Sequence, residues 1–187
     1  MRDRSIDKRL DDIYKMLKSL RKMMQYFLGT YSHYVGKAAE QLTAGIINRI
    51  WEMGGCSVGD KYVRPIRLVS RNVRGSNYEI DLIGMDEDGN VWIIETTTYP
   101  IFDMSLVDKI CRRINRWIEA NKKKPSFMLF AYGGIERGLS KILYDRLKSV
   151  CSEVIILDKI ESRKLIGLTD RLARKNDISN NAETLNG

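Results

Sequence analysis

The sequence contains few cysteines and almost no histidine. Its three cysteines, Cys56, Cys111 and Cys151, are odd in number and far apart, so neither a disulfide framework nor a zinc site with closely spaced thiolates is expected. The single histidine, His33, makes a histidine-based catalytic dyad or zinc site implausible. We therefore expect free thiols and a reducing compartment.

Long apolar runs are also missing. No stretch of about 18 apolar residues occurs, which excludes a transmembrane helix. The first residues, MRDRSIDKRLDD, lack the apolar core of a signal peptide. With 43% hydrophobic and 30% charged residues, the chain has the composition of a folded domain. The sequence thus predicts a cytoplasmic protein without a membrane partner.

Basic residues outnumber acidic ones, 32 to 24, which gives a net charge of +8. This charge indicates either an ordinary solvated surface or attraction to a polyanion, for which nucleic acid is the usual partner. The basic residues concentrate in two stretches, 61–75 and 102–124, which favours DNA as the partner. The predicted DNA-binding residues are Lys61, Arg64, Arg67, Arg71, Arg74, Arg112, Arg113 and Arg116.

Apolar residues recur with 4-3 spacing over the first 34 residues. They are Ile6, Leu10, Ile13, Leu17, Leu20, Met24, Phe27, Tyr31 and Tyr34. Roughly four heptads of this kind are typical of a coiled coil. We expect residues 1–34 to form an N-terminal coiled-coil helix through which the protein forms homo-oligomers. The alternative is a long helix that packs against its own domain.

The remaining chain alternates between helical and strand patterns. The expected elements are a helix at 35–53, strands at 61–69, 77–85 and 90–97, a helix at 104–122, a strand at 126–132, a helix at 138–150 and a strand at 153–157. This order predicts an α/β domain over 35–170, in which helices flank both faces of a mixed central sheet. The polar residues 171–187 are expected to form a flexible tail.

Two β-rich runs surround a Glu87-Asp88-Gly89 turn and predict a hairpin, with Gly89 at the position that needs a positive φ. In that register Asp81 and Glu95, each seven residues from Asp88, face each other with Cβ atoms roughly 4.5–5.5 Å apart. A bulge of one residue at the turn would shift this register.

Two facing carboxylates repel each other inside an apolar sheet. A divalent cation, Mg²⁺ or Mn²⁺, would offset the repulsion, and Mg²⁺ needs only one or two carboxylates besides waters and phosphate oxygens. The alternation of a strand adds Glu79 to the face of Asp81 and Thr97 to that of Glu95. Glu40 lies on a partly inward helical stripe and is a further candidate ligand. Alternatively, these acids lie at a solvated sheet edge and pair with arginines.

This arrangement over residues 35–157 resembles the PD-(D/E)XK nuclease superfamily, whose restriction-endonuclease-like core has the order α-β-β-β-α-β. The family pattern is a glutamate on the helix, an aspartate on the second strand and Glu-X-Lys on the third. Glu40, Asp81 and Glu95 match its acidic positions. The resemblance implies that these acids bind Mg²⁺, which activates water for hydrolysis of a DNA phosphodiester bond.

The family lysine falls at Thr97, and a threonine hydroxyl cannot stabilise developing negative charge as an ammonium group does. Lysine can move to the following helix in this family, where Lys109 is the nearest candidate. Two hypotheses follow: a Mg²⁺-dependent endonuclease, and a nuclease-like module that binds DNA or assembles without cleaving. A third hypothesis is an interaction protein in which the coiled coil is the working part.

Overall fold

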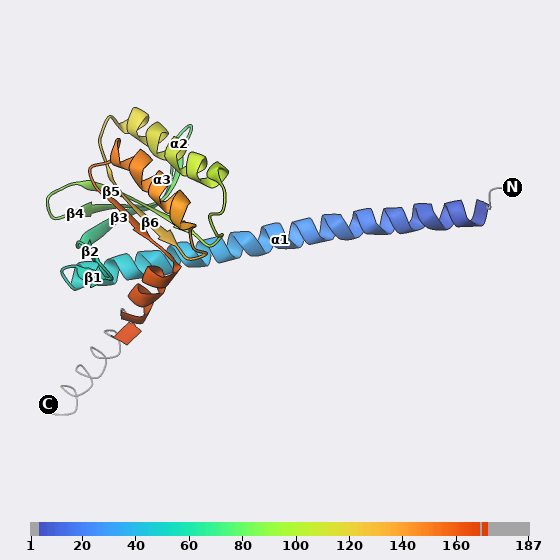
Figure 1. The fold of residues 1–187 in the computed structure, drawn as a ribbon, viewed down its shortest axis with the longest axis horizontal. Helices are drawn as coiled ribbons and strands as arrows, with labels where there is room; N and C mark the ends of the chain where they lie inside the picture. The colour runs from blue at the N-terminus through green and yellow to red at the C-terminus, as the bar shows by residue number, and fades with distance from the viewer. Residues whose placement is uncertain (1–3, 169, 172–187) are drawn as a thin grey trace, which may run out of the picture. The chain divides into compact units, whose positions relative to one another are not determined.

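The computed structural model describes residues 4–168 and 170–171, with the side chains of 4–13 and 25–29 left out (Figure 1). The contacts between Cα atoms divide the chain into two compact units, Met1–Ala38 and Ala39–Gly187. The tail predicted at 171–187 lies outside the described residues, apart from Arg171.

The first helix, α1, is one continuous helix over Arg4–Glu52. The prediction of two helices that meet near residue 35 is therefore wrong, because no proline interrupts residues 4–52. The predicted stop is confirmed. Gly54 and Gly55 follow α1 with φ of 69° and 101°, a conformation that glycine adopts at little cost.

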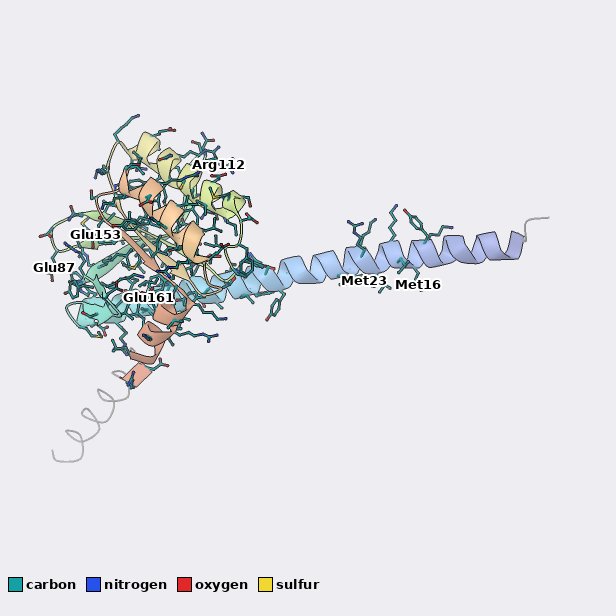
Figure 2. All side chains as sticks on the ribbon, in the orientation of Figure 1. Met16, Met23, Glu87, Arg112, Glu153 and Glu161 are labelled. Carbon is teal, nitrogen blue, oxygen red and sulfur yellow. The ribbon has the colours of Figure 1, made fainter. Side chains whose placement is uncertain are left out.

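In the first unit, the described side chains of the 4-3 pattern are exposed to solvent. The exposed fractions are 60% for Leu17, 47% for Leu20, 62% for Met24, 63% for Tyr31 and 67% for Tyr34. Figure 2 shows that Met16 and Met23 also point away from α1. The side chains of Ile6, Leu10, Ile13 and Phe27 lie outside the described residues. The coiled coil stays a prediction.

The second unit contains a five-stranded mixed sheet, as predicted. Its strand order is β3-β4-β5-β6-β7, with antiparallel pairing from β3 to β5 and parallel pairing from β5 to β7. The strands are β3 (Ile66–Arg74), β4 (Glu79–Asp86), β5 (Val91–Thr97), β6 (Ser126–Ala131) and β7 (Val154–Leu157). The register of β3 against β4 shifts between Leu68 and Ser70, so that Val69 is an extra, bulged residue.

The strand predicted at 61–69 is in fact two strands. β2 (Lys61–Val63) pairs with β1 (Cys56–Val58) in a separate two-stranded sheet, and β3 begins at Ile66. Between them lies Pro65, which has no N–H to donate to a ladder. The prediction missed both this break and the short strand β1.

Helices cover both faces of the five-stranded sheet, which confirms the predicted layering (Figure 1). On one face, α2 (Met104–Asn121) and α3 (Arg137–Lys148) pack on Ile93, Phe127 and Leu129. On the other, residues 39–52 of α1 and a helix at 159–168 pack on a core of Trp92, Ile94, Met128 and Phe130. None of the described helices has a stretch long and apolar enough to cross a bilayer.

Candidate active site

The hairpin of β4 and β5 has the predicted register. Leu82 pairs with Ile94 and Ile83 with Ile93, each pair equidistant from Asp88. Gly89 has a φ of 81°, and its N–H donates to Asp86 O over 3.1 Å. Because the turn adds no bulge, the same register continued by one residue brings Asp81 opposite Glu95.

Asp81 is held by the strand that faces it. Its Oδ2 accepts hydrogen bonds from Thr96 N over 2.8 Å and from Thr96 Oγ1 over 3.0 Å. The Asp81 side chain is 15% exposed. Burial raises the pKa of Asp81 above its usual value, and the hydrogen bonds from Thr96 and the charge of Arg113 only partly oppose this. Thr96 therefore fixes how the carboxylate is turned, a role that the sequence did not indicate.

Glu95 is almost fully buried, with 3% of its surface exposed. Its Oε2 accepts a hydrogen bond from the Arg113 guanidinium, whereas its Oε1 is buried and has no hydrogen-bond partner in the part of the chain that is described. Burial, followed by the charge of Asp81, raises the pKa of Glu95 well above its usual value, although Arg113 lowers it. One oxygen of this carboxylate is thus left for a ligand.

Arg113 on α2 pairs with both carboxylates. Besides its ion pair with Glu95, its guanidinium lies 4.0 Å from Asp81 Oδ1. The sequence predicts DNA binding for Arg113 and favours Lys109, one turn earlier and exposed, as the site cation. The available signal was the position of Arg113 beside the buried stripe of Ile110 and Ile114.

The other predicted ligands do not form a metal-binding cluster with this pair in the part of the chain that is described. Glu79 is exposed and its Oε1 lies 2.8 Å from Arg74. Glu40 is partly buried on α1. Among the described residues, no group of three or more histidine, cysteine or acidic side chains could hold a metal ion. Two carboxylates with one unbonded oxygen still fit Mg²⁺, which takes its remaining ligands from water and phosphate.

Thr97 stands where the resemblance places a lysine, and its hydroxyl forms a hydrogen bond within its own segment. Thr97 Oγ1 donates to Tyr99 O over 3.0 Å. This hydrogen bond ties the end of β5 to the loop that follows. The roles predicted for Glu40, Glu79, Thr97 and Lys109 stay predictions.

A cavity of about 590 Å³, here the basic groove, lies between α2 and the turn that joins β3 to β4. Arg116 Nη1 donates to Asn77 O in that turn over 3.0 Å. Arg112 is exposed on α2 (Figure 2). The basic side chains that line the groove are Arg74, Lys109, Arg112, Arg113 and Arg116.

The other predicted DNA-binding residues do not line this groove. Lys61 Nζ donates to Ile156 O over 2.7 Å and pairs with Glu161 over 2.6 Å. Arg64 pairs with Asp88 over 3.4 Å and Glu153 over 3.3 Å. Arg67 and Arg71 are exposed on β3. The predicted set is therefore divided: Arg74, Arg112, Arg113 and Arg116 line the groove, and of these Arg113 contacts the acidic pair.

No protein-family model matches the sequence, and no curated protein matches it. Two similar solved structures are a repair endonuclease from Pyrococcus abyssi, with a TM-score of 0.37, and an EndoMS–dsDNA2 complex, with a TM-score of 0.39. Each is 16% identical, and the matches cover 49% and 50% of this chain. They span 37% of each solved chain, little more than a third. At such TM-scores these likenesses carry no argument about this chain.

Proposed function

We propose that this chain is a metal-dependent endonuclease that hydrolyses phosphodiester bonds of DNA, with Asp81 and Glu95 as the ligands of Mg²⁺ or Mn²⁺. The observation that carries the proposal is Oε1 of Glu95, a buried acceptor without a hydrogen bond, next to a second carboxylate of raised pKa. An unsatisfied buried acceptor costs about 1–3 kcal/mol. A divalent cation would relieve both this cost and the repulsion between the carboxylates.

A divalent cation bound here would lower the pKa of an attacking water and neutralise charge on the phosphate. Thr96 holds Asp81 in a fixed orientation through two hydrogen bonds. Arg113 can pass its hydrogen bond from Glu95 to a phosphate oxygen, where a guanidinium stabilises developing negative charge. Lys109, one turn away, supplies the ammonium group that Thr97 cannot.

The basic groove would hold the DNA backbone on the side of Arg112 and Arg116. Several arginines in one groove neutralise several phosphates, so the affinity should fall steeply as salt is raised. The proposal thus predicts binding that depends strongly on ionic strength, and cleavage that also requires the acidic pair.

The test is a cleavage assay on DNA of varied structure with Mg²⁺ or Mn²⁺, together with calorimetric titration of the metal. Asp81→Asn and Glu95→Gln should both abolish cleavage and weaken metal binding. Glu87→Gln is the matched control, because Glu87 is an exposed acid in the turn of the same hairpin. A wild-type protein that leaves every DNA intact, or an Asp81→Asn variant that still cleaves, would contradict the proposal.

The second candidate is a nuclease-like module that binds DNA without cleaving it. One observation favours it: Arg113 already neutralises Glu95 from within the chain. The resemblance agrees, because Thr97 stands where it places a lysine. In that case DNA binding should be indifferent to Asp81→Asn, and calorimetry should detect no metal binding. The same cleavage and titration experiments therefore separate the two candidates.

The exposed 4-3 pattern of α1 supports a proposal of self-association through residues 1–34. Leu17, Leu20 and Met24 would leave water on pairing, and a seam of this spacing packs best against another helix of the same kind. Light scattering should show an oligomer that removal of residues 1–30 converts to a monomer. A monomeric full chain would contradict this proposal. It would also contradict the hypothesis of an interaction protein that works through its coiled coil.

A further inference from the structure

The loop at 98–103, between β5 and α2, is fixed by the loop that follows β6. Ile101 N donates to Gly134 O over 3.0 Å. Gly133 lies so close that a Cβ atom there would be 2.5 Å from Thr98 O, which leaves no room for any other residue. The backbone of the 98–103 loop therefore has little freedom to move.

This fixed loop keeps two large aromatic side chains in solvent. Tyr99 is 54% exposed and Phe102 is 71% exposed, whereas Ile101 between them is 1% exposed. Ile101 anchors the loop in the core, whereas the two aromatic rings on either side of it remain in solvent. Exposed aromatic rings on a rigid support are surfaces on which planar ligands stack.

Tyr99 and Phe102 line a cavity of about 430 Å³, here the aromatic cavity. Leu106 and Ile110 of α2 continue its apolar lining, and Glu95 also lines it. A mainly apolar cavity with a few polar groups is typical of sites for small planar molecules. This cavity therefore combines a surface for stacking with one of the two carboxylates of the proposed metal site.

The aromatic cavity adjoins the basic groove, because Lys109 and Arg113 line both. A strand whose phosphates lie in the groove would pass its sugar and base next to the aromatic cavity. In a paired duplex the bases are stacked and turned inward, so they cannot enter. An unpaired base can leave the stack and lie on an aromatic ring.

We propose that the aromatic cavity binds an unpaired nucleobase of the DNA strand whose phosphates occupy the basic groove. This inference rests on the proposed function, and it narrows the substrate to DNA with an unpaired nucleotide at the cleaved position. Phe102 supplies the main stacking surface, and Arg113 lies between base and phosphate, next to Glu95.

The test measures binding of the full chain in EDTA, so that no DNA is cut. The two probes are a fully paired duplex and the same duplex with one unpaired 2-aminopurine. Phe102→Ala should weaken binding of the unpaired probe about tenfold and that of the paired duplex less than twofold, because stacking on one aromatic ring contributes to only one of them. Phe102→Tyr keeps the ring and should bind as the wild type does.

Tyr144→Ala is the matched control, since Tyr144 is a partly exposed aromatic residue on α3 that does not line the aromatic cavity. It should change neither affinity. The 2-aminopurine emission should change when the wild type binds and change much less with Phe102→Ala, which reports the move of the base onto the ring without relying on affinity.

Two results would overturn the inference: equal losses on both probes with Phe102→Ala, or no loss on either. A shift in oligomeric state with Phe102→Ala would also overturn it, because the cavity would then serve a second copy of the chain. If the wild type binds both duplexes alike in EDTA, and cleaves both alike once Mg²⁺ replaces EDTA, only the aromatic cavity is misassigned. If it binds neither probe, the proposed function fails as well.

Discussion

Two buried carboxylates at opposite ends of the same hairpin have opposite surroundings. Asp86, at the turn end, is 7% exposed and accepts hydrogen bonds from Asn90 N over 2.8 Å, Asn90 Nδ2 over 3.0 Å and Trp92 Nε1 over 3.0 Å. Glu95, at the open end, has Arg113 on one oxygen and no hydrogen bond on the other among the described residues.

The pKa values of Asp86 and Glu95 diverge because their hydrogen-bond partners differ. Burial by itself raises the pKa of Asp86, but the hydrogen bonds from Trp92 and Asn90 outweigh it and hold that pKa below its usual value. At Glu95, burial and the charge of Asp81 outweigh the hydrogen bonds from Arg113 and the Asp81 backbone, so its pKa lies well above the usual value. Burial of an acid is therefore not itself a sign of function. A buried acid whose surroundings leave it unsatisfied is such a sign.

The largest effect is expected at Glu95. Glu95→Gln should lower metal-dependent DNA cleavage by about a thousandfold, since a neutral amide is a poor ligand for a hard cation and metal catalysis supplies several kcal/mol. The free energy of unfolding should change little, because the amide avoids the burial of a charge. Rate measurements at saturating metal, together with urea denaturation, test both statements. A large loss of stability in Glu95→Gln would indicate that Glu95, like Asp86, mainly stabilises the fold.

Asp86→Asn should have the opposite profile. The ionised carboxylate accepts three N–H bonds, whereas an amide cannot accept all three because one of its two polar groups is a donor. The free energy of unfolding should therefore fall by about 2–3 kcal/mol. Cleavage per folded molecule should stay at the wild-type level. In the wild type, the contribution of Asp86 is present above its unfolded pKa and is lost as the pH falls through its lower folded pKa. Denaturation curves at several acidic pH values follow this loss.

Arg113→Gln removes the internal cation and should lower the free energy of unfolding by about 2 kcal/mol near pH 8, less than for a fully buried pair because Arg113 is 22% exposed. The loss should shrink near pH 5. The pKa values of Asp81 and Glu95 are raised in the folded state. The stability that their protonated forms contribute is therefore present at low pH and is lost as the pH rises through those raised pKa values.

Mg²⁺ should also raise the Tm of Arg113→Gln more than that of the wild type, because the ion takes over the neutralisation of the carboxylates. Thermal melts with and without Mg²⁺ at both pH values measure this. Equal shifts in the two proteins would show that the ion does not take over this neutralisation.

The smallest effect is expected at Asn90. Asn90→Ala keeps the backbone N–H bond to Asp86 and loses only the side-chain bond, which should cost about 1 kcal/mol. Cleavage should not change. Glu87→Ala, an exposed neighbour in the same turn, provides the control and should alter stability by less than about 0.5 kcal/mol. An effect on cleavage at Asn90 would extend the functional site to the turn end of the hairpin.

The register of the hairpin could be predicted because it depends on local chemistry. Gly89 fixes the turn, and strand alternation then determines which side chains face each other. The contact between Arg113 and Glu95 could not be predicted in this way, because it depends on how α2 crosses the sheet. The split at Pro65 was readable from the sequence, since proline interrupts a ladder, but the apolar residues on both sides favoured a single strand. The course of α1 through Tyr34 was missed because the heptad pattern ends there while the helix does not.

The bulge at Val69 bears on how the protein behaves at high concentration. β3 is an outer strand of the five-stranded sheet, and an outer strand with free N–H and C=O groups can recruit strands from other molecules. The bulge interrupts the regular ladder there, and the charges of Arg67 and Arg71 repel a second copy of the same edge. These two arginines, which lie outside the basic groove, thus have a use that requires no DNA. Removing the charge of both arginines should cause aggregation in concentrated samples and leave DNA cleavage unchanged.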